Sequence, residues 1–287
     1  MKPYKLAVLT ASVIGALWGV GASAQTFNYN NSDLLLGIRS STGGTNDLVV
    51  DIGAASQYIT ASAPITISST YFTSGQLADA GISLNGLYFS VFGNVTGASS
   101  YGPNNTLWVT KANNSYATTG AGTPFTVQTS VQQAGTRSQM ESIAFGATLI
   151  SYYNTLPPQD NTASAVIVPS AFNQSAEGAI SYTVGIGSGG NFAGNFGSVN
   201  NIENSTGAGF TSSGAALVSE LYQLNPSNAG SPATELGYFQ LNTDGTLLYT
   251  PGPVPEPSTW AILGIGLISF LAVRRMKNTK QTKFNSQ

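Results

Sequence analysis

Three aspartates near the start of the chain have the residue type and spacing that acid–base chemistry requires. Asp33, Asp47 and Asp51 flank two short apolar runs, which are joined by a loop rich in Ser, Thr and Gly. A hairpin of these two runs would bring the carboxylates near one another. Paired carboxylates hydrolyse glycosidic bonds, one as the acid and the other as the base or nucleophile. A carbohydrate-active enzyme of this type is the alternative interpretation, because aspartates in turns and at edges are usually solvated.

Most other kinds of site are excluded by composition. The chain contains no Cys and no His, so disulfides, thiolate nucleophiles, haem, iron–sulfur and the usual zinc ligation, and every triad with an imidazole base are absent. A glycine-rich stretch at 185–190 is followed by no Lys, so we interpret it as a loop and not as a phosphate site. No calcium-loop motif occurs, although Asp and Asn leave a structural Ca²⁺ open as an alternative. We predict no catalytic residue, no metal and no cofactor.

Aromatic side chains offer a different kind of site, a platform for sugar rings. An exposed aromatic face can stack on a sugar, whereas a buried one only fills the core. We favour the core for all five candidates, which are Tyr101, Trp108, Tyr116, Tyr152 and Tyr153.

Charge is scarce and unevenly distributed. Charged residues make up 8% of the 287 residues, against roughly 25% in an average soluble domain. Residues 25–253 hold eleven acidic and three basic side chains, a net charge of −8, whereas both ends of the chain are basic. An acidic middle argues against nucleic acid as a partner, because phosphates require a basic face.

The middle of the chain has the pattern of a mainly β domain. Short runs rich in β-branched and aromatic residues alternate with Gly, Asn and Pro, and they lie at 34–38, 48–52, 87–92, 106–110, 125–129, 165–168, 180–186, 237–241 and 246–249. Capping-box spacing at Ser138–Glu141 and apolar residues as far as Ile150 predict one helix, and a second is expected near 76–80. We predict a β-sandwich or jelly roll with one or two helices. A parallel β-helix is the rival, but no fixed repeat supports it.

The N-terminal 24 residues have the layout of a secretory signal peptide. Lys2 and Lys5 precede an apolar run that ends near Val20, and Ala22 and Ala24 satisfy the small-residue rule at a cleavage site. We predict export through the Sec translocon and cleavage after Ala24.

The C-terminal end has three parts in a fixed order. Residues 251–258 form a Pro-rich stalk, which cannot continue a helix or a central strand. Residues 259–275 follow as a predicted transmembrane helix with Arg274 and Arg275 at its end, and 276–287 as a basic cytoplasmic tail that includes Lys277. The predicted membrane anchor consists of Trp260, Ile262, Leu263, Ile265, Leu267, Ile268, Phe270 and Leu271.

This order of parts resembles the PEP-CTERM sorting signal of Gram-negative bacteria. The matching residues are the motif Pro255, Glu256 and Pro257, the apolar segment, and the arginine pair. The resemblance implies recognition by exosortase, a membrane protein thought to cut near the motif. Segments at 33–39, 47–53, 220–226, 236–241 and 244–247 also resemble a recurrent ectodomain of this group, one for which the resemblance implies no activity.

Together these features predict an exported protein with an ectodomain at 25–250. The precursor is expected in the inner membrane, transiently, and the mature form at the cell surface or in the extracellular matrix. We expect a non-catalytic protein of a polysaccharide-producing bacterium, with exosortase, the Sec translocon and exopolysaccharide or biofilm matrix as partners and no nucleic acid.

Overall fold

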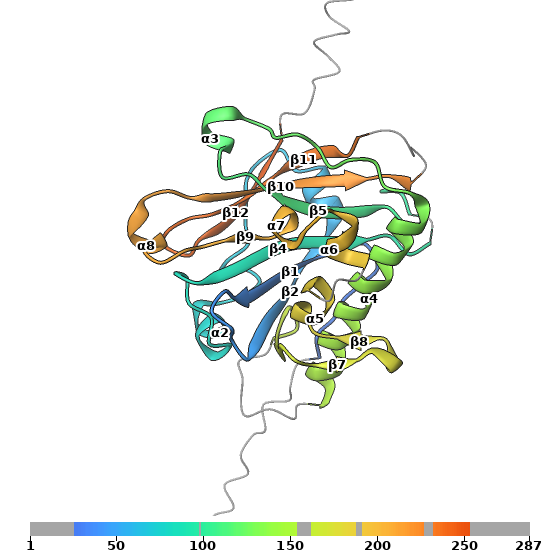
Figure 1. The fold of residues 1–287 in the computed structure, drawn as a ribbon, viewed down its shortest axis with the longest axis horizontal. Coiled ribbons are helices and arrows are strands. Elements are labelled where there is room, and N and C mark those ends of the chain that lie inside the picture. The colour runs from blue at the N-terminus through green and yellow to red at the C-terminus, as the bar shows by residue number, and fades with distance from the viewer. Residues whose placement is uncertain (1–25, 98, 154–161, 188–190, 227–231, 253–287) are drawn as a thin grey trace, which may run out of the picture.

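The computed structural model describes residues 26–97, 99–153, 162–187, 191–226 and 232–252 (Figure 1). The predicted signal peptide, stalk, transmembrane helix and tail lie outside these ranges. Within them the chain is mainly β, as its alternating runs predict.

Twelve strands and nine helices are present in the described ranges. The strands are β1 (Asp33–Ser40), β2 (Asn46–Ala54), β3 (Ile65–Thr66), β4 (Leu87–Asn94), β5 (Leu107–Ala112), β6 (Ala165–Pro169), β7 (Asn173–Gln174), β8 (Ala179–Ile180), β9 (Asn204–Ser205), β10 (Leu217–Leu224), β11 (Thr234–Leu241) and β12 (Leu247–Pro251). The helices are α1 (Ala55–Ile59), α2 (Ser74–Asp79), α3 (Tyr116–Thr119), α4 (Ser130–Tyr153), the 3₁₀ helix η1 (Ser175–Glu177), α5 (Tyr182–Gly187), α6 (Asn191–Asn195), α7 (Val199–Ile202) and α8 (Phe210–Ser213).

Ten of the strands form one antiparallel sheet. Its order is β3-β12-β11-β10-β5-β4-β1-β2-β6, with β9 paired to β4. Bulges interrupt the pairing near Asp33 in β1 and near Leu221 in β10, and bulges increase the bend and twist of a strand. The sheet curls on itself, and residues 67–72, which follow the edge strand β3, link its two edges. The Ile67 N–H donates to the Leu247 carbonyl of β12, and the hydroxyl of Ser164, just before the other edge strand β6, donates to the Tyr71 carbonyl.

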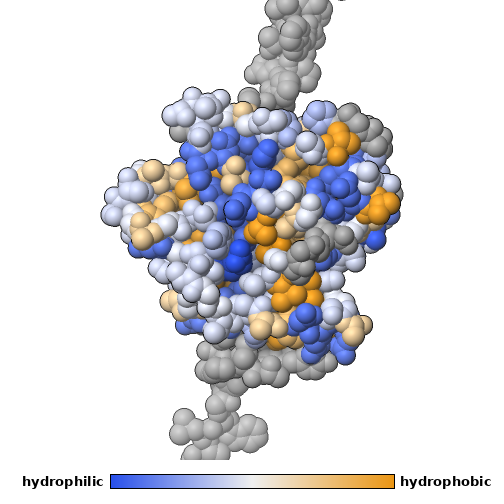
Figure 2. Space-filling view, in the orientation of Figure 1, coloured by the Kyte–Doolittle hydropathy of each residue, from blue (hydrophilic) through white to orange (hydrophobic). Residues whose placement is uncertain are grey.

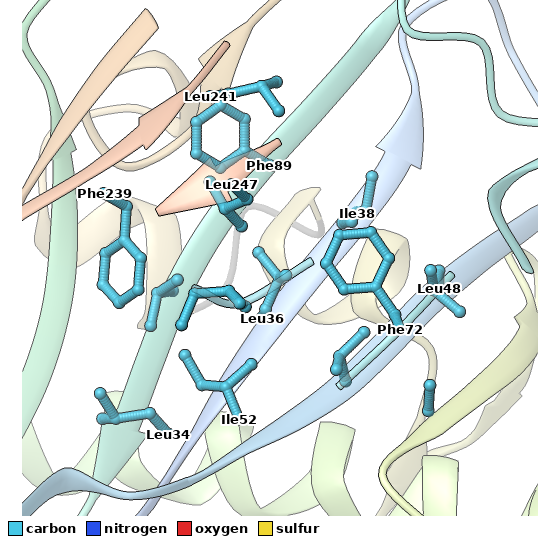
Figure 3. Close-up of a cluster of buried hydrophobic side chains, with 14 of the residues drawn as sticks. Leu34, Leu36, Ile38, Leu48, Ile52, Phe72, Phe89, Phe239, Leu241 and Leu247 are labelled. Carbon is cyan, nitrogen blue, oxygen red and sulfur yellow. The ribbon is translucent and has the colours of Figure 1, made fainter. Parts of the chain in front are cut away.

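The inside of the curl is one hydrophobic core. Strands at opposite ends of the sheet order contribute to it, as Leu48 and Ile52 of β2 and Leu247 of β12 show (Figure 3). In β1 the even-numbered residues point inward and Leu35 points outward, because successive side chains of a strand alternate between faces. Trp108 is the largest fully buried side chain in this core.

Helices cover the outside of part of the sheet. Helix α4 packs there with α5, α6 and α7, and a second core lies between these helices and the outward side chains of β1, β2, β4, β5, β6 and β10. The figures agree with this layering: α4 and α5 lie on one side of the sheet in Figure 1, and large apolar patches of Figure 2 lie over that side.

The fold differs from the prediction in its architecture. A sandwich has two separate sheets, whereas here β5 joins β4 to β10 and makes the sheet continuous. The rival β-helix is wrong, because every ladder in the described ranges is antiparallel. Several short helices also occur beyond the two predicted.

Two predicted strands are wrong. Residues 125–129 form no strand, and Phe125 packs on Phe196 and Tyr222 instead. Only Ala179–Ile180 pair in a ladder near 180–186, after which the chain turns into α5. In both places a short apolar run packs over the sheet. The prediction failed because periodicity alone cannot separate a short buried strand from a buried loop or helical turn.

Both predicted helices are confirmed, but the longer one begins earlier than expected. Helix α4 starts at Ser130, where Thr129 and Gln132 exchange hydrogen bonds in a capping box: the Gln132 N–H donates to Thr129 Oγ1 at 3.3 Å, and the Thr129 N–H to Gln132 Oε1 at 2.9 Å. The spacing at Ser138–Glu141 therefore lies inside the helix. The shorter helix is α2, with its own capping box at Thr73 and Gln76.

Candidate functional site

A groove of about 510 Å³ opens at the end of the curled sheet that α2 occupies. Its walls come from the segment between β3 and β4 and from the turn between β11 and β12. Hydroxyl groups form most of its polar lining and aliphatic or aromatic groups its floor: Thr66, Ser68, Ser69, Thr73, Ser74, Thr246, Asp244 and Gly245 on the one hand, and Phe72, Leu77, Ala78, Ile82 and Leu84 on the other. The groove thus joins an apolar floor to a rim that can donate and accept hydrogen bonds.

The β3–α2 wall is held by backbone contacts and by one strained residue. The Ser69 N–H donates to the Phe72 carbonyl at 2.8 Å, and Ser68 Oγ accepts the Leu247 N–H at 3.0 Å. Ser69 has φ of 62°, a left-handed conformation that residues with a Cβ adopt rarely and at a cost. The tight turn presents the exposed Ser69 side chain at the rim.

Several rim hydroxyls are available to a ligand. Within the part of the chain that the structure describes, no hydrogen-bond partner is present for the side chains of Thr66, Ser69 and Ser74, and all three residues are exposed. Free hydroxyls over an apolar floor suit a polar ligand with apolar faces, because the floor supplies area and the hydroxyls supply orientation.

One charged residue, Asp244, lines the groove. The predicted Asp244-Gly245 turn is confirmed: Gly245 has φ of 87° and its N–H donates to the Asn242 carbonyl at 3.0 Å. The Thr246 N–H donates to Asp244 Oδ1 at 2.8 Å and lowers the pKa of the Asp244 carboxyl. Asp244 therefore presents a carboxylate to the groove at neutral pH.

The structure brings together two of the three predicted aspartates. Asp33 and Asp51 are buried, with exposed fractions of 6% and 7%, and they lie close enough for the charge of Asp33 to act on Asp51. Each also accepts a backbone N–H, from Asn30 at 2.8 Å and from Gly53 at 2.7 Å respectively. Burial, and then the charge of Asp33, raise the pKa of Asp51 to about 7.

Asp47 lies toward the other end of the hairpin, apart from this pair. It accepts the Thr183 N–H at 2.7 Å and the Thr183 hydroxyl at 2.6 Å, which fastens α5 to β2. Burial raises the pKa of Asp47 and these two hydrogen bonds oppose that rise. The three aspartates therefore do not form one cluster, because the strands separate them along the hairpin.

A second polar network, on the helix-covered face of the sheet, was not predicted from the sequence. Arg39 of β1 binds Glu203, which follows α7, through two hydrogen bonds of 2.8 and 2.5 Å. Glu203 also accepts the Tyr182 hydroxyl at 2.7 Å, and Tyr182 contacts the Ser90 hydroxyl at 2.6 Å. Arg39 and Glu203 are 164 residues apart, so no local spacing could reveal them.

The aromatic candidates are scattered, not gathered into a platform. Trp108 is fully buried, as expected, but Tyr101 and Tyr152 are exposed by 39% and 72%. Tyr116 of α3 is half-buried against Tyr238 of β11, with 4.4 Å between the ring centroids. The side chain of Tyr153 lies outside the described part. None of these rings lines the groove.

The structure offers no metal cage and no membrane span in what it describes. Within the described ranges, no three acidic, His or Cys side chains lie close enough together to hold a metal ion. Among the helices of those ranges, none is both long and apolar enough to cross a membrane.

Every residue predicted for sorting lies outside the described ranges. These are Ala22 and Ala24, the motif Pro255–Pro257, the apolar residues of 259–273, and the charges Arg274, Arg275 and Lys277.

Comparison with known proteins identifies a motif in the C-terminal part of the sequence. Residues 253–275 match the family model of the PEP-CTERM protein-sorting motif. No curated protein and no solved structure matches the chain. The motif indicates an exported protein that is anchored through its C-terminus and then sorted and processed by exosortase.

Proposed function

Because the chain is a PEP-CTERM domain-containing protein, we propose that its ectodomain is a non-catalytic surface or matrix protein that binds exopolysaccharide in the groove beside α2. The signal peptide directs export through the Sec translocon and is cleaved after Ala24, in a Gram-negative cell. The transmembrane helix at 259–275 holds the precursor in the inner membrane until exosortase acts.

The observation that carries this proposal is the lining of the groove. Thr66, Ser69 and Ser74 present hydroxyls at its rim that have no partner among the described residues, and Leu84 and Phe72 lie at its floor. Sugar rings have hydroxyl groups at their edges and C–H groups on their faces, so the edges would bond to the rim while the faces pack on the floor. The volume of about 510 Å³ lies in the range of small-ligand sites, roughly 300–1,000 Å³.

The charge of the groove favours a particular polysaccharide. Its one charged lining residue is acidic, and the ectodomain around it has a net charge of −8 over residues 25–253. A polysaccharide rich in carboxylates would be repelled, since like charges cost free energy when they are brought together. We infer a neutral or amino-sugar polysaccharide.

The hydrolase alternative has weaker support. Retaining and inverting glycosidases hold their carboxyl groups roughly 5–9.5 Å apart, with a sugar or water between them. Asp33 and Asp51 are both less than 10% exposed, and each carboxylate is already bound to a backbone N–H of its own loop. They line neither the groove nor the small apolar pocket beside it, which Phe72, Leu84 and Leu247 line.

Binding of the wild-type ectodomain to exopolysaccharide from the native culture, measured by affinity electrophoresis, tests the proposal. Ser74→Trp fills the groove and should weaken binding at least tenfold. Ser115→Trp is the matched control, because Ser115 is an equally exposed serine beside α3, away from the groove. Unchanged binding by Ser74→Trp would exclude the groove, and no binding by the wild type would exclude the function.

A further inference from the structure

We propose that exosortase docks on the end of the ectodomain formed by α3 and the start of β11. We call this surface the exit face, and define it by Tyr116, Glu235, Leu236 and Tyr238.

The chain leaves the domain at a fixed point beside β11. Pro251, the last residue of β12, pairs with Gly237, and the Gly252 N–H donates to the Leu236 carbonyl at 2.9 Å. Tyr238 follows Gly237 directly, and its ring contacts Tyr116 of α3. The exit face therefore surrounds the point at which Gly252 leaves the sheet (Figure 1).

The sorting motif cannot lie far from this point. Glu256 is four residues beyond Gly252, and even a fully extended chain advances by at most about 3.6 Å per residue. The motif is thus held within about 15 Å of the exit face. An enzyme that closes on the motif must bring its own surface to that face, because 15 Å is only slightly more than the width of one helix with its side chains.

The exit face carries groups suited to a protein partner. Tyr116 and Tyr238 are half-buried and present amphipathic rings, a type enriched at protein interfaces. In Glu235 one side-chain oxygen, Oε1, is shielded from solvent and has no hydrogen-bond partner within the described ranges. Burial, and then the nearby charge of Glu220, raise the pKa of Glu235. Glu235 as a whole is only half-buried, so part of the residue is accessible to a partner.

A rigid support lies behind these groups. Glu220 is fully buried, and its oxygens accept the Gly122 N–H at 2.5 Å, the Asn113 amide at 2.9 Å and the Tyr222 hydroxyl at 2.9 Å. These bonds fix both ends of the loop that carries α3 onto β10. A surface held in place before contact loses less conformational entropy on binding.

A protein partner fits the exit face better than the lipid surface does. The ectodomain is acidic, and both Glu220 and Glu235 lie at this end. Anionic lipid headgroups attract basic segments and repel acidic ones. The carboxylate of Glu235 would instead pair with a basic or hydroxyl side chain of the enzyme.

The groove lies at the other end of β12 from the exit face. Gly245 and Thr246 line the groove, and β12 runs from Leu247 to Pro251, five residues that span about 15 Å. Figure 1 likewise places α2 and α3 at opposite ends of the molecule. If the proposed polysaccharide binding holds, the groove stays open while the exit face is occupied.

Site-specific photo-crosslinking of the full-length precursor tests the docking face directly. The chain has no Cys, so Ser115→Cys introduces a single thiol next to α3, and Ser74→Cys a matched single thiol at the groove. Both are labelled with benzophenone maleimide in membranes that contain the native exosortase. We expect an exosortase adduct from position 115 at least fivefold stronger than from position 74. Equal adducts, or none from position 115 while the precursor is still processed, would overturn the proposal.

A second measurement tests the chemistry of the face. In pulse-chase labelling, Glu235→Gln combined with Tyr238→Ser should slow precursor processing about fivefold or more. Asp79→Asn, an exposed acid of α2 at the far end, is the control. Protease resistance of the exported variants verifies folding. Wild-type processing by the folded double variant would overturn docking on the exit face, while leaving polysaccharide binding by the groove untouched.

Discussion

Asp33 and Asp51 bring two buried carboxyl groups together across the bulged start of the β1–β2 hairpin, where the charge of Asp33 raises the pKa of Asp51. Two carboxylates held together in a buried place repel each other, so a proton on one of them is favoured. Tyr29, Tyr58 and Tyr71 are the other titratable groups near the pair, and Glu141 lies beyond Tyr29. The buried pair therefore favours a bound proton, and the free energy of unfolding should depend on its charge.

Stability should fall as pH rises toward neutrality. The pKa of Asp51 is raised from 3.8 to about 7, first by burial and then by Asp33. Between these values the folded chain keeps a proton that the unfolded chain has released, so the free energy of unfolding decreases with rising pH and levels off above about 7. Asp51→Asn should remove the part of this slope that Asp51 contributes and raise the free energy of unfolding at pH 8 by about 1–3 kcal/mol. Urea unfolding from pH 4 to 8 measures it. The same slope in Asp51→Asn as in the wild type would contradict the assignment, and Asp79→Asn is the exposed control.

Arg39→Met should destabilise the fold strongly. It leaves Glu203, whose side chain is 0% exposed, without its ion-pair partner, and an unpaired buried charge costs about 3–5 kcal/mol. Adding Glu203→Leu should restore part of this loss, because the second change removes the stranded charge. Arg137→Met, at a partly exposed ion pair with Glu141, should cost only about 0–1 kcal/mol for its ion pair. Equal losses for Arg39→Met and Arg137→Met, by urea unfolding, would speak against the buried network.

Gly146→Ala should also destabilise the fold, because α4 approaches β8 closely at this residue. A Cβ at position 146 would overlap the backbone oxygen of Ile180, and backbone cannot move aside as a flexible side chain can. We expect a loss of about 1–3 kcal/mol in the free energy of unfolding. The control is Gly187→Ala in α5, where a Cβ meets nothing within 4 Å. A neutral Gly146→Ala would mean that α4 lies farther from β8.

Trp108 should report on the inner core by fluorescence. Of the three tryptophans, Trp18 and Trp260 lie in the predicted signal peptide and anchor, so Trp18→Phe and Trp260→Phe leave one emitter. Trp108 is 0% exposed, and its emission should lie toward the blue and resist acrylamide until the chain unfolds. Ready quenching in the folded state would place this ring at the surface, where it could act as a sugar platform.

Local sequence patterns were sufficient to predict much of the secondary structure of the chain. The apolar runs of β1 and β2, the Asp244-Gly245 turn and the helices near Met140 and Leu77 could be predicted because each depends on neighbours within a few residues. The sorting motif was predictable for the same reason. The start of α4 was missed because two capping boxes compete in one segment, and the one at Thr129 lies beside a run that reads as a strand.

What the sequence alone determined is therefore the position of most of the longer strands and of α2 and α4, the mainly β character and the sorting signal at 253–275. Only the tertiary structure decided that one continuous sheet curls on itself, that Asp33 meets Asp51 and not Asp47, and that Ser69 and Asp244 line one groove. The reason is physical. Turns and amphipathic periods are encoded within a few residues, whereas strand order and curvature depend on how all ten strands bury their side chains together, and residues far apart in the chain meet only once that packing is complete.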